Sequence, residues 1–233
     1  MSAAAPAEAP GRACMASLVT SLADNKAALG RRYAEWAVSA PTLESAVAAA
    51  AMAQDELGHA RSTYPVLKAL GAEAVDEGPN RLALLDDELP DWTAFIAANL
   101  LVDGVLTTFV AACADSALTL MAQRARKILQ EECSHRVHAE AWAARLCRGA
   151  ERAALVERLR ETWEQAGRWA GPDDDPGYRD ALAASLVGRT PADQREQVRA
   201  WLVALLAREG VEIALEEPAD WSAWDAERRR WAP

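Results

Sequence analysis

The sequence predicts an all-α protein built as a helical bundle, and its composition, periodicity and helix-end signals agree on this class. Hydrophobic residues make up 51% of the 233 positions, and much of that fraction is Ala and Leu, which are strong helix formers. Leu18, Leu22, Leu29 and Tyr33 recur at helical spacing, whereas no convincing alternating strand pattern is found.

The first two helices are predicted to form an antiparallel hairpin. The first runs over about 14–38 and ends at Ser39-Ala40-Pro41, because proline disfavours α geometry in the residue before it. Thr42 can cap the second helix, which runs to about Leu70, where Gly71 is a natural stop. The short connection between them favours antiparallel packing.

A longer polar crossover, 72–90, separates this hairpin from the next one and contains one helical turn near 82–85. The third helix opens at Pro90-Asp91 and runs to about Ala114, and the fourth spans about 118–148. Two hairpins joined by one crossover are the connectivity of a ferritin-like four-helix bundle.

Extra helices are predicted beyond the bundle. They cover about 151–169, 178–186 and 190–208, with a Gly-, Pro- and Asp-rich loop at 171–177. Residues 1–13 read as a disordered lead, 14–209 as the bundle with its peripheral helices, and 210–233 as a mostly irregular tail.

Charge and cysteine usage narrow the functional classes. The net charge of −10 and the pI of about 4.9 argue against a broad nucleic-acid-binding surface. The four cysteines form no CxxC motif, and residues 1–13 lack a basic region followed by a long apolar run. We therefore expect a soluble cytoplasmic protein with reduced thiols and no membrane contact.

Two of the three histidines lie in Glu-x-x-His motifs. Glu56 and His59 belong to the second helix, and Glu132 and His135 to the fourth. Residues three apart share one face of a helix, so each pair can offer a carboxylate and an imidazole to one metal ion. Both pairs lie on otherwise apolar stripes, where buried polar groups need partners.

Asp103 is the single acid on the apolar stripe of the third helix. It precedes Glu132 by 29 residues, a spacing that brings two residues level in a hairpin of long helices. A dinuclear centre on this scaffold takes one carboxylate from each of the two remaining helices. Asp103 can supply one of them.

The first helix does not offer a carboxylate at the position where this pattern requires one. Counting back from Glu56 by 29 or 30 residues leads to Ala27 or Lys26, and Lys26 is the one on the apolar stripe. Three interpretations stay open for Lys26. It extends to solvent, it enters the site and pairs with Glu56 in place of one metal, or the first helix is shifted so that Asp24 or a water completes the site. A polar core network without any metal is the alternative for the whole cluster.

Three segments resemble the catalytic subunit of phenylacetyl-CoA epoxidase, in the phenylacetic acid catabolic family of ferritin-like di-iron proteins. They are Ala53-Gln54-Asp55-Glu56-Leu57-Gly58-His59, Leu101-Val102-Asp103-Gly104 and Gln130-Glu131-Glu132-Cys133-Ser134-His135. The resemblance implies a metal set of Glu56, His59, Asp103, Glu132 and His135, with Glu56, Asp103 and Glu132 as catalytic residues. The glutamate that the family has on its first helix falls at Lys26.

The resemblance implies an oxygenase subunit that uses two iron ions, or manganese, to activate oxygen for an aromatic or acyl-CoA substrate. Electrons would come from a separate reductase, and the chain would form homo-oligomers or pair with a related helical subunit. The alternative is a non-catalytic partner subunit with a degenerate site. A third possibility is another ferritin-like activity, such as metal storage or a specialised oxidation.

Overall fold

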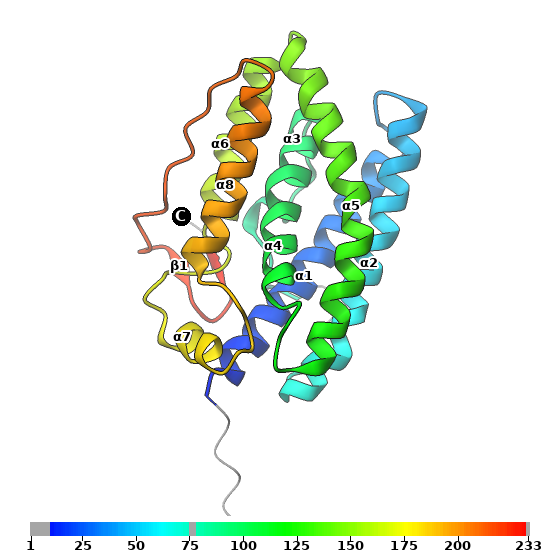
Figure 1. The fold of residues 1–233 in the computed structure, drawn as a ribbon. Helices are drawn as coiled ribbons and strands as arrows, with labels where there is room; N and C mark the ends of the chain where they lie inside the picture. Colours follow the sequence, from blue (N-terminus) through cyan, green and yellow to red (C-terminus); the bar gives the residue numbers. More distant parts are fainter. Residues whose placement is uncertain (1–9, 75–77, 232–233) are drawn as a thin grey trace, which may run out of the picture.

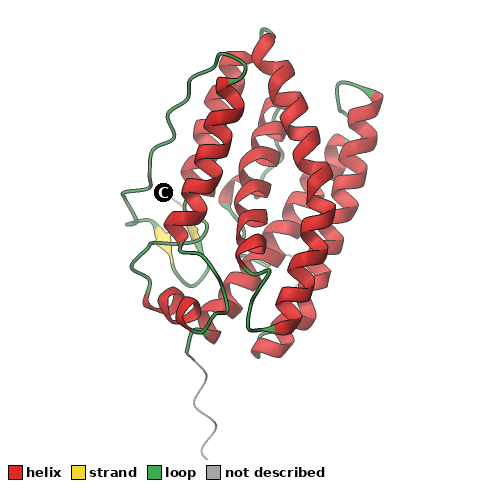
Figure 2. Cartoon of the chain, in the orientation of Figure 1, coloured by secondary structure: helices red, strands yellow, loops and turns green. Residues whose placement is uncertain are grey.

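The computed structural model describes residues 10–74 and 78–231. Its core is a bundle in which α1 packs along α2 and a broken central helix packs between α5 and the outer helices (Figure 1). The bundle elements are α1 (Arg12–Trp36), α2 (Leu43–Leu70), α3 (Trp92–Ala97), η2 (Ala98–Asp103), α4 (Gly104–Ala112) and α5 (Thr119–Arg148). The prediction of an all-α helical bundle is confirmed (Figure 2).

The α1–α2 hairpin follows the local signals of the sequence. The Thr42 side chain accepts a hydrogen bond from the Ser45 backbone N–H at 3.2 Å and so caps α2. Gly71 ends α2 in the left-handed region, at φ 83°, which glycine adopts without steric cost. The short connection between Trp36 and Leu43 places the two helices side by side.

The central helix is interrupted rather than continuous. Between α3 and α4 the chain forms one π-helical segment, η2, in which hydrogen bonds span five residues instead of four. The span Trp92–Ala112 is long enough to cross a membrane; its 18-residue apolar window has a mean hydropathy of 1.8, and 83% of that window is buried. It is therefore the core helix of a bundle whose other helices cover it.

Three further helices cover the bundle: α6 (Arg152–Ala166), α7 (Pro176–Ala183) and α8 (Pro191–Ala207). The Thr190 side chain and Asp193 form a reciprocal capping box at the start of α8. The 72–90 crossover contains one short 3₁₀ turn, η1 (Ala83–Leu85), where a single helical turn was predicted. α6 and α8 pack against the central helix, on the side away from α1 and α2 (Figure 1).

Several predicted boundaries need correction. The first helix begins at Arg12, two residues before the predicted start; most of the predicted lead, residues 1–9, lies outside the described residues. The short helix begins at Pro176 rather than at Tyr178, since Asp175 caps it by accepting from the backbone of Gly177.

Most of the tail over 210–231 has no regular secondary structure. It contains an antiparallel pair of short strands, β1 (Trp224–Asp225) and β2 (Arg230–Trp231). Two buried arginines attach it to the body. Arg195 on α8 donates to Glu217, and Arg229 donates to the Ala170 carbonyl.

Candidate metal centre

Three elements of the bundle bring the predicted site residues together in the interior. Glu56 and His59 come from α2, Asp103 from the end of η2, and Glu132 and His135 from α5. All five side chains are buried. One donor atom each from Glu56, Asp103, Glu132 and His135 lies within 4.8 Å of the others, in a group that can hold a metal ion. His59 is not part of that group.

The π-helical segment ends at Asp103 itself. Because a π turn holds one residue more than an α turn, it rotates the residues that follow it around the helix axis. The Asp103 carboxylate faces α1 and α5, where it contacts Lys26 and His135. The register of the aspartate therefore depends on an irregularity that the sequence periodicity does not show.

Lys26 enters the cluster. Its Nζ lies 2.6 Å from Asp103 Oδ1, 2.5 Å from Glu132 Oε1 and 3.0 Å from Glu56 Oε1. The ammonium thus uses its three donors on three carboxylates contributed by three different elements. Of the three interpretations of Lys26, the structure shows the second, in which the lysine enters the site and pairs with Glu56.

The two histidines join the cluster to acids nearer the surface. His135 Nδ1 lies 3.2 Å from Asp103 Oδ2 and 3.3 Å from an oxygen of Glu56, while its Nε2 lies 3.3 Å from Asp55 Oδ2. His59 Nε2 pairs with Glu131 Oε2 at 2.9 Å.

Two buried atoms of the α2 motif make no hydrogen bond. His59 Nδ1 lies 3.2 Å from Glu132 Oε1, but the contact lacks hydrogen-bond geometry, and Glu56 Oε2 has no partner either. Both atoms belong to the Glu-x-x-His pair of α2. Buried polar atoms without partners carry a desolvation cost.

Opposite charges shift the protonation of the basic groups. Burial by itself would lower the pKa of Lys26, but the carboxylates of Asp103, Glu132 and Glu56 raise it well above its ordinary value. Burial by itself would also lower the pKa of His135, but hydrogen bonds to Asp103, Glu132 and Glu56 raise that pKa strongly. Both groups therefore carry a positive charge at neutral pH.

The pKa values of the two glutamates of the cluster, Glu56 and Glu132, are shifted in opposite directions. Burial, with the negative charge of Asp103 added to it, raises the pKa of Glu56 to about 7. Burial also acts to raise the pKa of Glu132, but Lys26 and His135 hold it well below its ordinary value. Glu132 is thus ionised, and the charges of the cluster balance largely within the protein.

The donor set does not fit a dinuclear metal centre. Such a centre on this scaffold needs a carboxylate from the first helix, and α1 offers an ammonium, which has no lone pair to donate. The four converging donors fit one divalent ion only if Lys26 Nζ leaves its three carboxylates, because a metal would contact the same oxygen atoms.

Four side chains close to the cluster were not among the predicted site residues. Asp55 and Glu131 each hold a ring nitrogen of a site histidine; their place beside the two motif glutamates was the available signal. The thiol of Cys133, which follows Glu132, is exposed. His138 lies against Trp92 and Phe95, and burial lowers its pKa.

A helical bundle whose buried carboxylates and histidine could hold a metal ion is the arrangement of a ferritin-like protein. Within that class the chain belongs to the phenylacetic acid catabolic protein family, whose model matches residues 1–233. A search of curated proteins found no match.

Family membership supports a role in phenylacetate catabolism and, in general terms, an oligomeric partner. Among the described residues, one helical span is long and apolar enough to cross a membrane, and most of it is buried inside the bundle.

Proposed function

We propose that this chain is a cytoplasmic helical partner subunit of an oxygenase complex of phenylacetate catabolism, and that Lys26 fills its own site in place of metal. One observation carries the proposal. The ammonium of Lys26 lies within 3.0 Å of an oxygen of Glu56, Asp103 and Glu132. These are the carboxylates that a metal would need.

Charge balance supports the same function. Lys26 and His135 are protonated beside the ionised Glu132, and the raised pKa of Glu56 lets that carboxyl hold a proton near neutral pH. Buried charges are tolerated when they are paired and hydrogen-bonded. The cluster therefore needs no further cation to be stable, and a divalent ion would have to displace the lysine.

A metal measurement tests the proposal. The protein is expressed in medium supplemented with iron and manganese, and both metals are measured per chain in the wild type and in the Glu56→Ala and Glu132→Ala variants. We expect far less than one metal per chain in all three and a wild-type melting temperature that a chelator leaves unchanged. Two metals per chain, lost in both variants, would refute the proposal.

The partner role needs its own experiment. Co-expression with a related chain that has the complete set of four carboxylates and two histidines should yield a stable complex containing both chains. All the metal in that complex should belong to the related chain. A wild-type chain that remains alone in size-exclusion chromatography beside such a partner would contradict the partner role.

The second candidate is the oxygenase itself, with two iron ions, or manganese, at Glu56, His59, Asp103, Glu132 and His135. Its substrate would be an aromatic or acyl-CoA compound, and a separate reductase would supply electrons. The unpartnered Glu56 Oε2 and His59 Nδ1 favour this candidate, because metal coordination would satisfy both atoms. It requires Lys26 to leave the cluster. Two metals per chain together with oxygen consumption would support it.

A further inference from the structure

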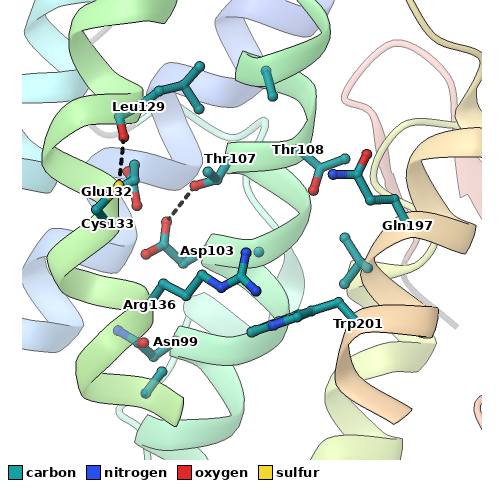
Figure 3. A pocket seen from close by; sticks show the side chains of 14 residues that line it. Asn99, Asp103, Thr107, Thr108, Leu129, Glu132, Cys133, Arg136, Gln197 and Trp201 are labelled. Atoms are coloured by element: carbon teal, nitrogen blue, oxygen red, sulfur yellow. Dashed lines mark hydrogen bonds between the residues drawn. The ribbon is translucent and has the colours of Figure 1, made fainter. Parts of the chain in front are cut away.

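A pocket of about 270 Å³ lies between η2, α4, α5 and α8, directly beside the lysine cluster. Asp103 and Glu132 form part of its inner wall, and Trp201 and Gln197 of α8 lie on the opposite side (Figure 3). Apolar side chains such as Leu129 and Val198 supply much of the remaining lining. Mostly apolar concave sites with a few polar groups are typical of small-molecule binding.

One lining residue has an unused hydrogen-bond acceptor. Asn99 is only 4% exposed, and its Nδ2 donates to the Tyr33 hydroxyl at 3.0 Å and to Met52 Sδ at 3.3 Å. Its Oδ1 accepts no hydrogen bond. A buried carbonyl oxygen without a donor is costly, so a bound molecule that brings an N–H or O–H group would be stabilised there.

The charged side chains around the pocket disfavour an anionic ligand. Asp103 and Glu132 place carboxylates on the inner wall. Arg136 is the single cationic side chain of the described lining, and it is already engaged: Nε donates to Glu140 at 2.7 Å, and the guanidinium stacks 4.8 Å from the Trp201 ring. An anionic ligand would therefore have to compete with Glu140 for the one cation of this described lining.

We propose that this pocket binds a small uncharged molecule with a ring-sized apolar body and one hydrogen-bond donor, such as an aromatic alcohol, a phenol or a primary amide. Its donor meets Asn99 Oδ1, and its body packs against Leu129, Val198 and the Trp201 indole. A dry cavity of roughly 150 Å³ already holds benzene in another protein, so the volume suffices for one ring. The proposal is independent of whether metal binds the cluster.

Cys133 gives a direct readout on the unmodified protein. It lines the pocket and is an exposed thiol, whereas Cys113 and Cys147 are buried. Benzyl alcohol, toluene and benzoate are compared for their ability to slow alkylation of Cys133 by iodoacetamide, followed by peptide mass spectrometry. We expect protection by benzyl alcohol at lower concentration than by toluene, and none by benzoate.

A blocking variant and a matched control complete the test. A Cβ added at Gly104 would lie 3.7 Å from Val198 Cγ1 and 3.8 Å from Trp201 Cζ3, so the longer side chain of Gly104→Leu extends into the pocket. Gly58 on α2 has nothing within 4 Å of an added Cβ, which makes Gly58→Leu the control. Ligand-observed NMR should lose the benzyl alcohol signal change in Gly104→Leu and keep it in Gly58→Leu.

Each contrary result overturns a defined part of the proposal. Equal protection by toluene would show that Asn99 does not bind the ligand's hydrogen-bond donor. Protection by benzoate would show that the ligand need not be neutral. Failure of all three probes on the wild type means that water alone fills the pocket. Since none of these results depends on metal content or on a partner chain, they leave the proposed function to be judged separately.

Discussion

A lysine ammonium and a divalent metal ion make different demands on the same three carboxylates. The ammonium donates hydrogen bonds at 2.5 to 3.0 Å, carries a single charge and is covalently tied to α1. A metal ion carries two charges, binds oxygen more closely and can leave. Lys26 therefore gives the bundle a permanent cation. The helices can pack around Glu56, Asp103 and Glu132 in the absence of a metal ion.

Removing that cation should destabilise the protein strongly. Lys26→Met leaves Glu56, Asp103 and Glu132 without the cation that pairs them, and breaking a buried pair in this way costs about 3–5 kcal/mol. Thermal unfolding of the metal-free protein measures the loss. Lys68→Met is the matched control, because Lys68 is exposed at the end of α2 and surface substitutions cost at most about 0.5 kcal/mol. Equal melting temperatures for the two variants would contradict the role of Lys26.

The charge-reversing variant should create a need for metal. Lys26→Glu places a fourth carboxylate beside Glu56, Asp103 and Glu132, where like charges repel in the absence of a cation. We expect its melting temperature to fall below that of the wild type in chelator and to rise with added iron or manganese. A wild type that gains as much from metal as Lys26→Glu would show that the lysine does not replace the ion.

Most residues of this site could be predicted from the sequence, but the role of Lys26 could not. Two Glu-x-x-His motifs and the interval from Asp103 to Glu132 identified side chains that the fold does bring together. Lys26 could be located by spacing, but a long flexible side chain can reach solvent or turn inward. Only the packing of α1 against η2 and α5 decides between these orientations.

At the scale of elements, helix ends were predictable and the irregularity inside the central helix was not. Thr42, Gly71 and Thr190 act through their own backbone neighbours, so a few residues of sequence contain the information. The segment η2 lies in a helix whose residues from Trp92 to Asp103 are all buried. With every face apolar, hydrophobic periodicity cannot report a π turn.

The N-cap of α3 should contribute a pH-dependent term to stability. Asp91 Oδ1 accepts from the Ala94 N–H at 2.8 Å, and Oδ2 pairs with Arg158 at 3.0 Å. Partial burial opposes the shift, but these bonds and the one from Thr93 lower the pKa of Asp91. A lowered native pKa stabilises the fold above the unfolded pKa, and this contribution is lost as the pH falls through the native pKa.

Asp91→Ala should therefore cost about 1 kcal/mol at neutral pH, and the difference from wild type should shrink in acid. Urea unfolding followed by circular dichroism at several pH values measures the cost. Asp87→Ala, an exposed aspartate in the preceding segment, serves as the control. A cost that stays constant down to the most acidic pH would mean that the carboxylate charge does not contribute.

At the scale of the whole molecule, the tail and α8 hold each other in place. Arg195 is 3% exposed on α8; its Nη1 donates to the Gly171 carbonyl at 3.0 Å and its Nη2 to Asp173 at 2.6 Å, while its Nε meets Glu217 of the tail at 2.5 Å. One buried side chain thus ties α8, the 171–177 loop and the tail together. Since α8 forms the outer wall of the pocket, the tail supports that wall from outside.

Replacing this arginine should release the tail while leaving the bundle folded. Arg195→Met removes three contacts, and a local loss of about 1–2 kcal/mol increases the open population by roughly 5- to 30-fold. Limited proteolysis with chymotrypsin should then cut faster after Trp221, which lies 5.7 Å from the Arg195 guanidinium. The helical circular dichroism should not change.

Arg199→Met provides the comparison, because Arg199 pairs only with Glu196 of the same helix among the described residues. Its cleavage rate should match that of the wild type. If Arg195→Met were also cut no faster, the tail would be held by Arg229 and its bond to the Ala170 carbonyl. If instead both tail cleavage and thiol alkylation at Cys133 accelerate in Arg195→Met alone, the tail and the pocket wall formed by α8 open together as one cooperative unit.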